Sequence, residues 1–160
     1  MTAPDVRLRP VTPDDRAFLL AVYGSTRTDE LALTDWSEPQ KAAFIQQQFS
    51  AQDHHYRKYY PNAEFSVIEF NGQSVGRLYV DRWEREIRIM DMAILPGYRN
   101  AGIGSRLLGQ LQSEAGAAGK TLSIHVERMN PALRLYERLG FRPAADKGVY
   151  LLLEWQPKAL

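Results

Sequence analysis

A basic, glycine-rich turn between an apolar strand and an amphipathic helix is the stretch of this sequence that most directly suggests chemistry. The strand runs from Ile87 to Leu95 and ends at Pro96, and the turn reads Arg99-Asn100-Ala101-Gly102-Ile103-Gly104. A helix with one apolar face follows, carrying Leu107, Leu108, Leu111 and Ala115. Glycines let a ligand approach the backbone closely, and the first N–H groups of a helix have no intrahelical partners. The arrangement therefore predicts an anion site, with a pyrophosphate as a suitable guest.

Two well-known phosphate loops can be compared with this turn. Gly97 and Gly102 have the spacing of a P-loop, but Ile103-Gly104 follows where that loop needs Lys and Ser or Thr. A dinucleotide fingerprint starting at Gly102 would place its third glycine where Leu107 stands. The remaining pattern, Arg-x-x-Gly-x-Gly after an Ile-Leu-Pro strand end, resembles the acetyl-CoA-binding signature of the GNAT superfamily of N-acetyltransferases. The alternative is a glycine turn that only tightens a join between strand and helix.

A second stretch carries the same resemblance. Asn130 to Phe141 reads N-P-A-L-R-L-Y-E-R-L-G-F and resembles the helix with Asn, Tyr and Gly-Phe that follows the fifth strand of the GNAT fold. The resemblance extends from Val6 to about Trp155. Its motifs lie between Glu86 and Phe141, whereas Thr12 to Pro61 matches only in outline.

The composition limits the classes of protein to consider. The chain has 160 residues, 44% hydrophobic and 24% charged, which suits one soluble domain with a sizeable core. The net charge of +1 gives no reason to expect nucleic acid or a membrane surface as a partner. The absence of cysteine excludes disulfides, thiolate metal ligands and a thiol nucleophile. Because the N-terminus has no apolar leader, we expect a cytoplasmic protein.

The first part of the chain predicts a strand and two helices. Val6 to Val11 alternates, and we expect Val6 and Leu8 to face inward and Arg7 and Arg9 outward. Thr12-Pro13-Asp14-Asp15 predicts a helix start capped by Thr12, and Gly24-Ser25 its end. After a polar connection over residues 26–39, a capping box at Ser37 predicts a helix that ends at about Ala51.

The rest of the chain predicts a sheet with two more helices. Asn71-Gly72 between Glu64–Phe70 and Gln73–Asp81 is a strong hairpin signal, and with the strand that ends at Leu95 it predicts three consecutive antiparallel strands. The remaining predicted elements are a strand over Lys120–Val126, a helix that starts at Asn130-Pro131 and ends at Gly140, and a final strand over Val149–Trp155.

The GNAT resemblance adds a fold and a reaction to this pattern. It implies an α+β fold, which is the α/β three-layer arrangement of the family: a mixed, largely antiparallel central sheet of about six or seven strands flanked by helices. It implies one N-acetyltransferase domain over residues 1–160. The implied reaction moves an acetyl group from acetyl-CoA, as cosubstrate, directly to a primary amine, without a covalent enzyme intermediate or a metal. The absence of cysteine and of a Gly-x-Ser-x-Gly elbow agrees with direct transfer.

The same resemblance assigns residues to the cofactor. The pyrophosphate is expected at the turn, and the pantetheine arm along the exposed edge of the central strand, where Met92 and Ile94 would otherwise be ordinary core residues. Asn130 maps onto an asparagine that hydrogen-bonds the arm, although it could be simply a helix cap. The residues expected to contact the cofactor are Met92, Ile94, Arg99, Asn100, Ala101, Gly102, Ile103, Gly104, Ser105 and Asn130.

Three residues are candidates for proton transfer. Tyr136 maps onto the family tyrosine that protonates the leaving thiolate, and a phenol with a pKa near 10 is a neutral donor at pH 7. The alternative for Tyr136 is a half-buried helix residue with a satisfied hydroxyl. Asp91 and Glu86 on the central strand are candidates for the base that deprotonates the incoming ammonium, directly or through a water. Asp91 could instead be a structural carboxylate that caps a backbone group or pairs with Arg88 or Arg77.

Three other groups of residues have weaker functional interpretations. His54-His55 could suggest a metal, but adjacent histidines cannot share a helix face, and a solvated or cleft-lining pair is preferred. The aromatic residues Tyr56, Tyr59 and Tyr60 could stack an acceptor or pack in the core. The acidic residues Asp29, Glu30, Asp35 and Glu38 could attract a cationic amine or form a solvated loop.

The sequence leaves the acceptor open. The preferred acceptor is a primary amine of a small molecule or peptide. The alternatives are a protein lysine or N-terminus, or a non-catalytic module that binds acyl-CoA. Neither nucleic acid nor a membrane is expected as a partner, and a homodimer is possible because dimers are common in the family that the sequence resembles.

Overall fold

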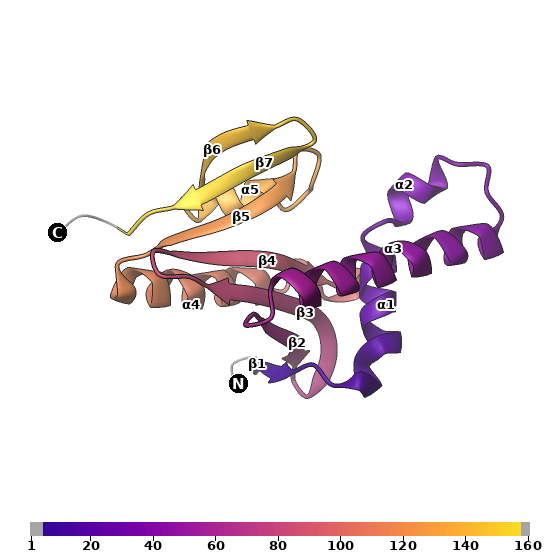
Figure 1. Ribbon diagram of the computed structural model, residues 1–160, viewed down its shortest axis with the longest axis horizontal. Coiled ribbons are helices and arrows are strands. Elements are labelled where there is room, and N and C mark those ends of the chain that lie inside the picture. Colours follow the sequence, from indigo (N-terminus) through magenta and orange to yellow (C-terminus); the bar gives the residue numbers. More distant parts are fainter. Residues whose placement is uncertain (1–4, 158–160) are drawn as a thin grey trace. The chain divides into compact units, whose positions relative to one another are not determined.

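The computed structural model describes residues 5–157 (Figure 1). They form five α-helices and seven strands, and the strands belong to one sheet. The strands are β1 (Val6–Pro10), β2 (Glu64–Phe70), β3 (Gln73–Arg82), β4 (Glu86–Ile94), β5 (Thr121–Glu127), β6 (Arg142–Lys147) and β7 (Tyr150–Trp155). The helices are α1 (Arg16–Ser25), α2 (Thr28–Ala32), α3 (Glu38–Tyr59), α4 (Ile103–Ala118) and α5 (Leu133–Arg138), with 3₁₀ turns at Pro13–Asp15 and Pro96–Tyr98.

The strands follow the order β1-β2-β3-β4-β5-β7-β6. β1 and β2 pair antiparallel, β4 and β5 parallel, and β7 antiparallel with both β5 and β6. This mixed sheet with flanking helices confirms the predicted fold class. The hairpin at Asn71-Gly72 has positive φ at both residues, 50° and 84°, as the predicted type I′ turn requires.

The chain divides into two compact units. The first comprises residues 1–78 and 93–98, and the second comprises residues 79–92 and 99–160. In the first unit, α1 packs on α3, and Tyr23 stacks on Phe49 with ring centroids 6.2 Å apart. Leu19 and Val67 complete this buried cluster. In the second unit, α4 packs on β5 through a face that includes Leu107, Leu108, Leu111 and Ala115, all buried as predicted.

Two helices differ from the prediction. Residues 26–39 are not entirely loop, because α2 forms within them. The capping box at Ser37 is confirmed: Gln40 N donates to Ser37 Oγ at 3.3 Å, and Ser37 N donates to Gln40 Oε1 at 2.8 Å. However, α3 ends at Tyr59 rather than near Ala51. The helix continues because residues 51–60 contain no proline or glycine, and because Arg57 pairs with Asp53 one turn earlier, at 3.2 Å.

Strand β6 was not predicted from the sequence. It pairs antiparallel with β7 at the edge of the sheet, and its register shifts between Pro143 and Ala145. The sequence Arg142–Lys147 does not alternate between hydrophobic and polar residues, which is the pattern that predicts a strand. This agrees with its position, because its side chains are mostly exposed. An edge position also tolerates a proline, because one side of the strand makes no ladder hydrogen bonds.

The predicted faces of β1 are correct for Val6, which is half-buried, and Arg7, which is exposed, but wrong for Leu8 and Arg9. Leu8 is 39% exposed, whereas Arg9 is half-buried and forms a two-pronged ion pair with Asp15. The two guanidinium–carboxylate distances are 2.8 and 2.7 Å, and Glu69 accepts a further bond from Arg9 at 3.3 Å. Thr12 is the N-cap of the 3₁₀ turn at Pro13–Asp15, as predicted, and forms a capping box with Asp15. Its N–H and hydroxyl both donate to Asp15.

Replacing Asp15 with Asn is expected to destabilise the protein by about 1–3 kcal/mol, because a half-buried guanidinium loses its two-pronged charged partner and keeps only the longer bond to Glu69. The Arg9 guanidinium lowers the pKa of Asp15 well below its usual range. The stabilisation is therefore complete at neutral pH and declines as the pH falls below about 3.9, where the unfolded chain takes up the proton first. Urea unfolding at pH 7 and at pH 3 measures both effects.

Arg7→Ala is the matched control for this pair. Arg7 also pairs with an aspartate, Asp5, but both side chains are largely exposed, at 73% and 51%. Exposed pairs contribute about 0–1 kcal/mol, so this variant is expected to unfold like the wild type. Equal destabilisation by Asp15→Asn and Arg7→Ala would contradict a special role for the pair formed by Arg9 and Asp15.

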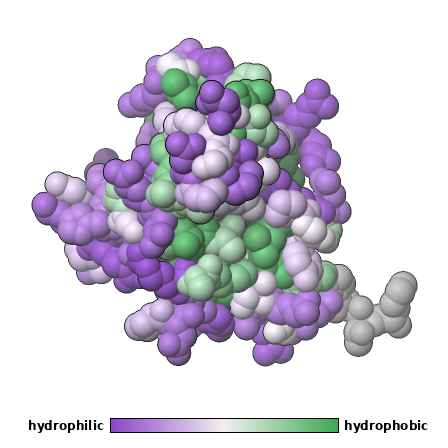
Figure 2. Space-filling model, turned by 90° about the vertical axis from the view of Figure 1, so that its right-hand side faces the viewer, coloured by the Kyte–Doolittle hydropathy of each residue, from purple (hydrophilic) through white to green (hydrophobic). Residues whose placement is uncertain are grey.

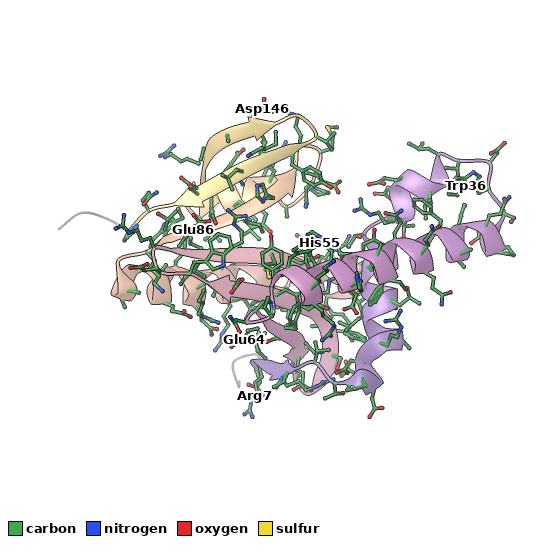
Figure 3. The ribbon with its side chains drawn as sticks, in the orientation of Figure 1. Arg7, Trp36, His55, Glu64, Glu86 and Asp146 are labelled. Carbon is green, nitrogen blue, oxygen red and sulfur yellow. The ribbon has the colours of Figure 1, made fainter. Side chains whose placement is uncertain are left out.

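The face of the molecule drawn in Figure 2 is mostly hydrophilic, with hydrophobic side chains showing in patches between the polar ones. Trp36 lies in the segment between α2 and α3 (Figure 3), and its ring meets Phe44 edge-on at 5.2 Å. Within residues 5–157, no helix is long and apolar enough to cross a membrane.

Candidate active site

The glycine-rich turn has the geometry of an anion site. Asn100 and Gly102 both have left-handed backbone conformations, with φ of 62° and 83°, and Gly102 is the N-cap of α4. The first helical hydrogen bond joins Arg106 N to Gly102 O at 3.1 Å, so helix geometry leaves the amides of residues 103–105 without intrahelical acceptors. A Cβ at Gly102 would meet no atom within 4 Å. The backbone at this helix start is therefore open to a ligand.

The central strand β4 leaves its neighbour β5 partway along its length. The parallel register runs from Glu86 opposite Thr121 to Ile89 opposite Ile124, although β4 continues to Ile94. From His125 to Glu127, β5 stays paired with β7 on its other side. The described part of the chain thus has a β4 edge beyond Ile89 that is not in register with β5. Met92 and Ile94, the residues predicted to meet the pantetheine arm, lie on this part of the strand.

The opposite edge of β4 is held tightly against β3 within the first unit. Leu95 N donates to Val75 O at 2.8 Å. A Cβ at Gly76 would lie closer to Ala93 O than real Cβ atoms approach backbone oxygens, so only glycine allows this approach. The end of β4 is therefore fixed on its β3 side.

Tyr136 is buried on α5, where 2% of its surface is exposed. Its ring meets Phe141 edge-on at 5.6 Å, and Phe141 N donates to Tyr136 O at 3.0 Å. Gly140 has a φ of 94° and closes the helix, as predicted. Burial, and then the charge of Asp91, raise the pKa of the Tyr136 hydroxyl above its ordinary value. The phenol therefore stays protonated throughout the neutral range, and Asp91 is near enough to influence it.

Asn130 begins a turn rather than the helix itself. Its side-chain oxygen accepts a bond from Ala132 N at 2.8 Å, and its carbonyl accepts one from Leu133 N at 3.1 Å. The helix proper starts at Leu133, two residues after Pro131 and later than predicted. Asn130 therefore caps this turn, which was one of the two roles considered from the sequence. The cap uses the side-chain oxygen of Asn130 and not its NH₂ group.

The two candidate bases occupy different surroundings. Glu86 lies at the start of β4, beside β5 (Figure 3), and accepts hydrogen bonds from Arg88 at 2.8 Å and from Ser123 at 2.6 Å. These two partners commit Glu86 to a structural network. Asp91 is half-buried on the same strand, near Tyr136. The geometry thus favours Asp91 as the base. That Glu86 acts as a base stays a prediction, and its hydrogen bonds to Arg88 and Ser123 do not favour it.

The network around Arg88 was not identified from the sequence. Besides Glu86, Arg88 donates to Ser123 at 2.7 Å, lies 3.3 Å from His125 Nδ1, and stacks over Trp83 at 5.0 Å. Its members come from two strands that are 35 residues apart in sequence, so only the sheet brings them together. One pattern in the sequence could have indicated that these polar residues share a face of the sheet. They alternate with residues that are buried, Ile87 and Ile89 on β4 and Leu122 and Ile124 on β5.

No group of three or more potential metal ligands forms among residues 5–157. His54 and His55 lie on α3, and both are exposed. His55 contacts the ring of Tyr59 at 4.8 Å and that of Tyr60 at 6.2 Å. The rings of His55, Tyr59 and Tyr60 thus lie together at the end of α3.

Comparison with known proteins supplies the family. The model of the acetyltransferase (GNAT) domain matches residues 61–143, which include the turn, β4, α4, β5 and Tyr136. The ribosomal protein bS18-alanine N-acetyltransferase of Haemophilus influenzae is 36% identical over 72 residues, which are 44% of this chain and 49% of that protein. The matched segment thus spans about half the length of this relative.

Solved structures share the fold. PaiA N-acetyltransferase from Thermoplasma acidophilum, solved in complex with coenzyme A, superposes with a TM-score of 0.72 at 16% identity, covering 95% of this chain and 99% of that one. The ribosomal-protein-S18-alanine N-acetyltransferase of Escherichia coli superposes with a TM-score of 0.60 at 20% identity, covering 97% and 96%. The family match over residues 61–143, with the fold and site geometry around it, shows that this chain belongs to the GNAT family of acetyltransferases.

Proposed function

We propose that this chain is an acetyl-CoA-dependent N-acetyltransferase that moves an acetyl group directly to a primary amine of a small molecule or peptide. The family match across the turn and the helix of Tyr136 is the observation that carries this proposal. The open backbone at Gly102 supports binding of the cosubstrate pyrophosphate there, with Arg99 adding a charge-assisted contact. The β4 edge beyond Ile89, with Met92 and Ile94, suits strand-like pairing with an extended amide-containing arm.

The chemistry needs three proton transfers. The first proton of the ammonium passes to Asp91 or to a water that Asp91 holds, and the nitrogen of the neutral amine attacks the thioester carbon, so that a C–N bond forms and the C–S bond breaks. Tyr136 gives its proton to the departing thiolate, and the second proton that the amide nitrogen loses restores the Tyr136 hydroxyl. Asn130 would bind the cosubstrate arm through its amide while it caps the turn before α5. These roles apply the predicted residues to the geometry described above.

For the acceptor, we propose the α-amine at the N-terminus of a peptide or protein as the first class to test. The relative from Haemophilus influenzae is named for acetylating an alanine of ribosomal protein bS18. A primary amine on a small molecule remains the second class. We also propose that residues 1–160 form one N-acetyltransferase domain, because the seven strands follow one another in a single sheet order. A cytoplasmic location and a homodimer remain predictions.

The test combines binding and turnover. Calorimetry should show micromolar binding of acetyl-CoA, and a free-thiol assay should show CoA release that depends on a short peptide with an N-terminal alanine. Mass spectrometry should place one acetyl group on the α-amine. A protein that binds acetyl-CoA but transfers it to no amine would be an acyl-CoA-binding module instead. Failure to bind acetyl-CoA would overturn the proposal.

A further inference from the structure

A polar network lines one face of the paired part of β4 and β5 and reaches the point where their register ends. Arg88 is held by Glu86, Ser123 and the ring of Trp83, and its terminal nitrogen reaches His125 Nδ1 at 3.3 Å. Ser123 itself donates to Glu86 at 2.6 Å and is fully buried. A guanidinium held in this way has little freedom, so it presents one fixed N–H to the imidazole.

His125 is the first β5 residue beyond the last pair between β4 and β5, Ile89 opposite Ile124. It is exposed, whereas its neighbours Ile124 and Val126 are buried, at 4% and 2% exposure. Successive side chains of a strand point to opposite faces, so His125 is on the face opposite Ile124 and Val126.

Since α4 packs on β5 with its apolar face, we assign it to the side of Leu122, Ile124 and Val126 rather than to the polar side of Ser123 and His125. Gln112 of α4 donates to Leu139 O at the end of α5, at 2.7 Å. Tyr136 on α5 therefore lies on the helix-covered side of this part of the sheet. His125 lies on the other side, at the same opening. If the thioester enters between β4 and β5, the leaving sulfur is on the Tyr136 side, and the attacking amine arrives from the His125 side.

The contact with Arg88 determines which imidazole nitrogen carries the proton. A guanidinium can only donate, so Nδ1 accepts, and neutral His125 has its proton on Nε2. Partial desolvation of the imidazole, and then the positive charges of Arg88 and Lys147, lower the pKa of His125, and Glu86 opposes them. The imidazole is therefore neutral near pH 7 and offers Nε2–H as a donor. It is poorly suited to act as a base, because its lone pair faces Arg88.

We infer that His125 binds the acceptor, its Nε2–H donating to the carbonyl oxygen next to the α-amine that is acetylated. An amine that is about to attack must direct its lone pair at the thioester carbon, so that lone pair cannot accept a hydrogen bond from His125. The Nε2–H of His125 therefore needs another acceptor atom on the substrate. A peptide α-amine has a carbonyl oxygen on the adjoining carbon, whereas a lysine ε-amine has only methylene groups there. The positive surroundings of Arg88 also suit an oxygen. The inference rests on the proposed function and specifies its substrate class.

Two probe peptides test this inference in the full-length protein. One has a free N-terminal alanine and no lysine, and the other has a blocked N-terminus and one lysine. His125→Ala is expected to lower kcat/KM for the alanine peptide about 5- to 10-fold, mainly through KM, and to change the lysine peptide less than 2-fold. His125→Gln, which keeps an N–H donor at a similar reach, should restore the alanine peptide to within about 2-fold. His54→Ala, another exposed histidine, is the control.

The outcomes separate this inference from the proposed function. Equal losses on both peptides, no loss on either, or a wild type that prefers the lysine peptide would overturn the role of His125 while leaving the transferase intact. A large loss of kcat in both variants would show His125 to be a base and would also overturn it. A wild type that binds acetyl-CoA but acetylates neither peptide overturns the α-amine inference, and one that does not bind acetyl-CoA overturns the proposed function itself.

Discussion

Tyr136→Phe is expected to lower kcat by about 10²-fold while the dissociation constant for acetyl-CoA changes less than about 3-fold. The substitution removes only the hydroxyl, so the ring keeps its edge-on contact with Phe141 at 5.6 Å and α5 keeps its packing. What is lost is the group proposed to donate a proton to the thiolate. Steady-state kinetics with the alanine peptide and calorimetry with acetyl-CoA measure the two quantities separately.

The surroundings of Tyr136 also predict the pH dependence. Burial and the charge of Asp91 raise the pKa of the hydroxyl above 10, so the neutral, donating form persists below that pH. Loss of rate with rising pH between 7 and 10 is therefore not expected from Tyr136. A loss with falling pH is expected instead, because the amine and its base become protonated.

Tyr59→Phe is the matched control, because Tyr59 is 61% exposed on α3. It loses a hydroxyl from a surface tyrosine and is expected to leave both kcat and affinity unchanged. If Tyr136→Phe turned over acetyl-CoA as fast as the wild type, Tyr136 would have no part in proton transfer, and water would be the remaining acid.

The second large effect is expected at the turn. Gly104→Arg should weaken acetyl-CoA binding by at least about 100-fold, because Gly104 is buried in the first turn of α4 and a long side chain there would occupy the space of the pyrophosphate. Arg99→Ala, at an exposed position, should weaken binding about 10-fold by removing one charge-assisted contact. Calorimetry measures both affinities.

Gly109→Arg controls for the new arginine. It lies on the same helix, and a Cβ there would meet no atom within 4 Å, so the side chain has room. Thermal unfolding of the three variants separates a lost ligand contact from a lost fold. Wild-type affinity in a folded Gly104→Arg protein would place the pyrophosphate elsewhere, and the same result with Arg99→Ala would exclude the turn altogether.

Local signals in the sequence were sufficient for several elements. Asn71-Gly72 predicted the hairpin because few residues adopt positive φ without strain, and Ser37 with Gln40 predicted the start of α3 because the capping box involves only neighbours. Gly140 and Phe141 predicted the end of α5 in the same way. The glycine-rich turn is local too, so the sequence alone predicted the anion site and, with Asn130 and Tyr136, the family.

Only the tertiary structure decided the features that depend on residues far apart in sequence. Arg9 faces inward because Asp15 and Glu69 neutralise it, and β6 forms because β7 supplies its hydrogen-bond partners. Glu86 accepts hydrogen bonds from Arg88 and from Ser123, and only the pairing of β4 with β5 brings Ser123 to it. No motif in the sequence singled out His125. It became a candidate because β4 and β5 pair only as far as Ile89 and Ile124, so that His125 is the first residue beyond the pairing. This register is set by packing across the sheet, and no local pattern of side chains encodes it.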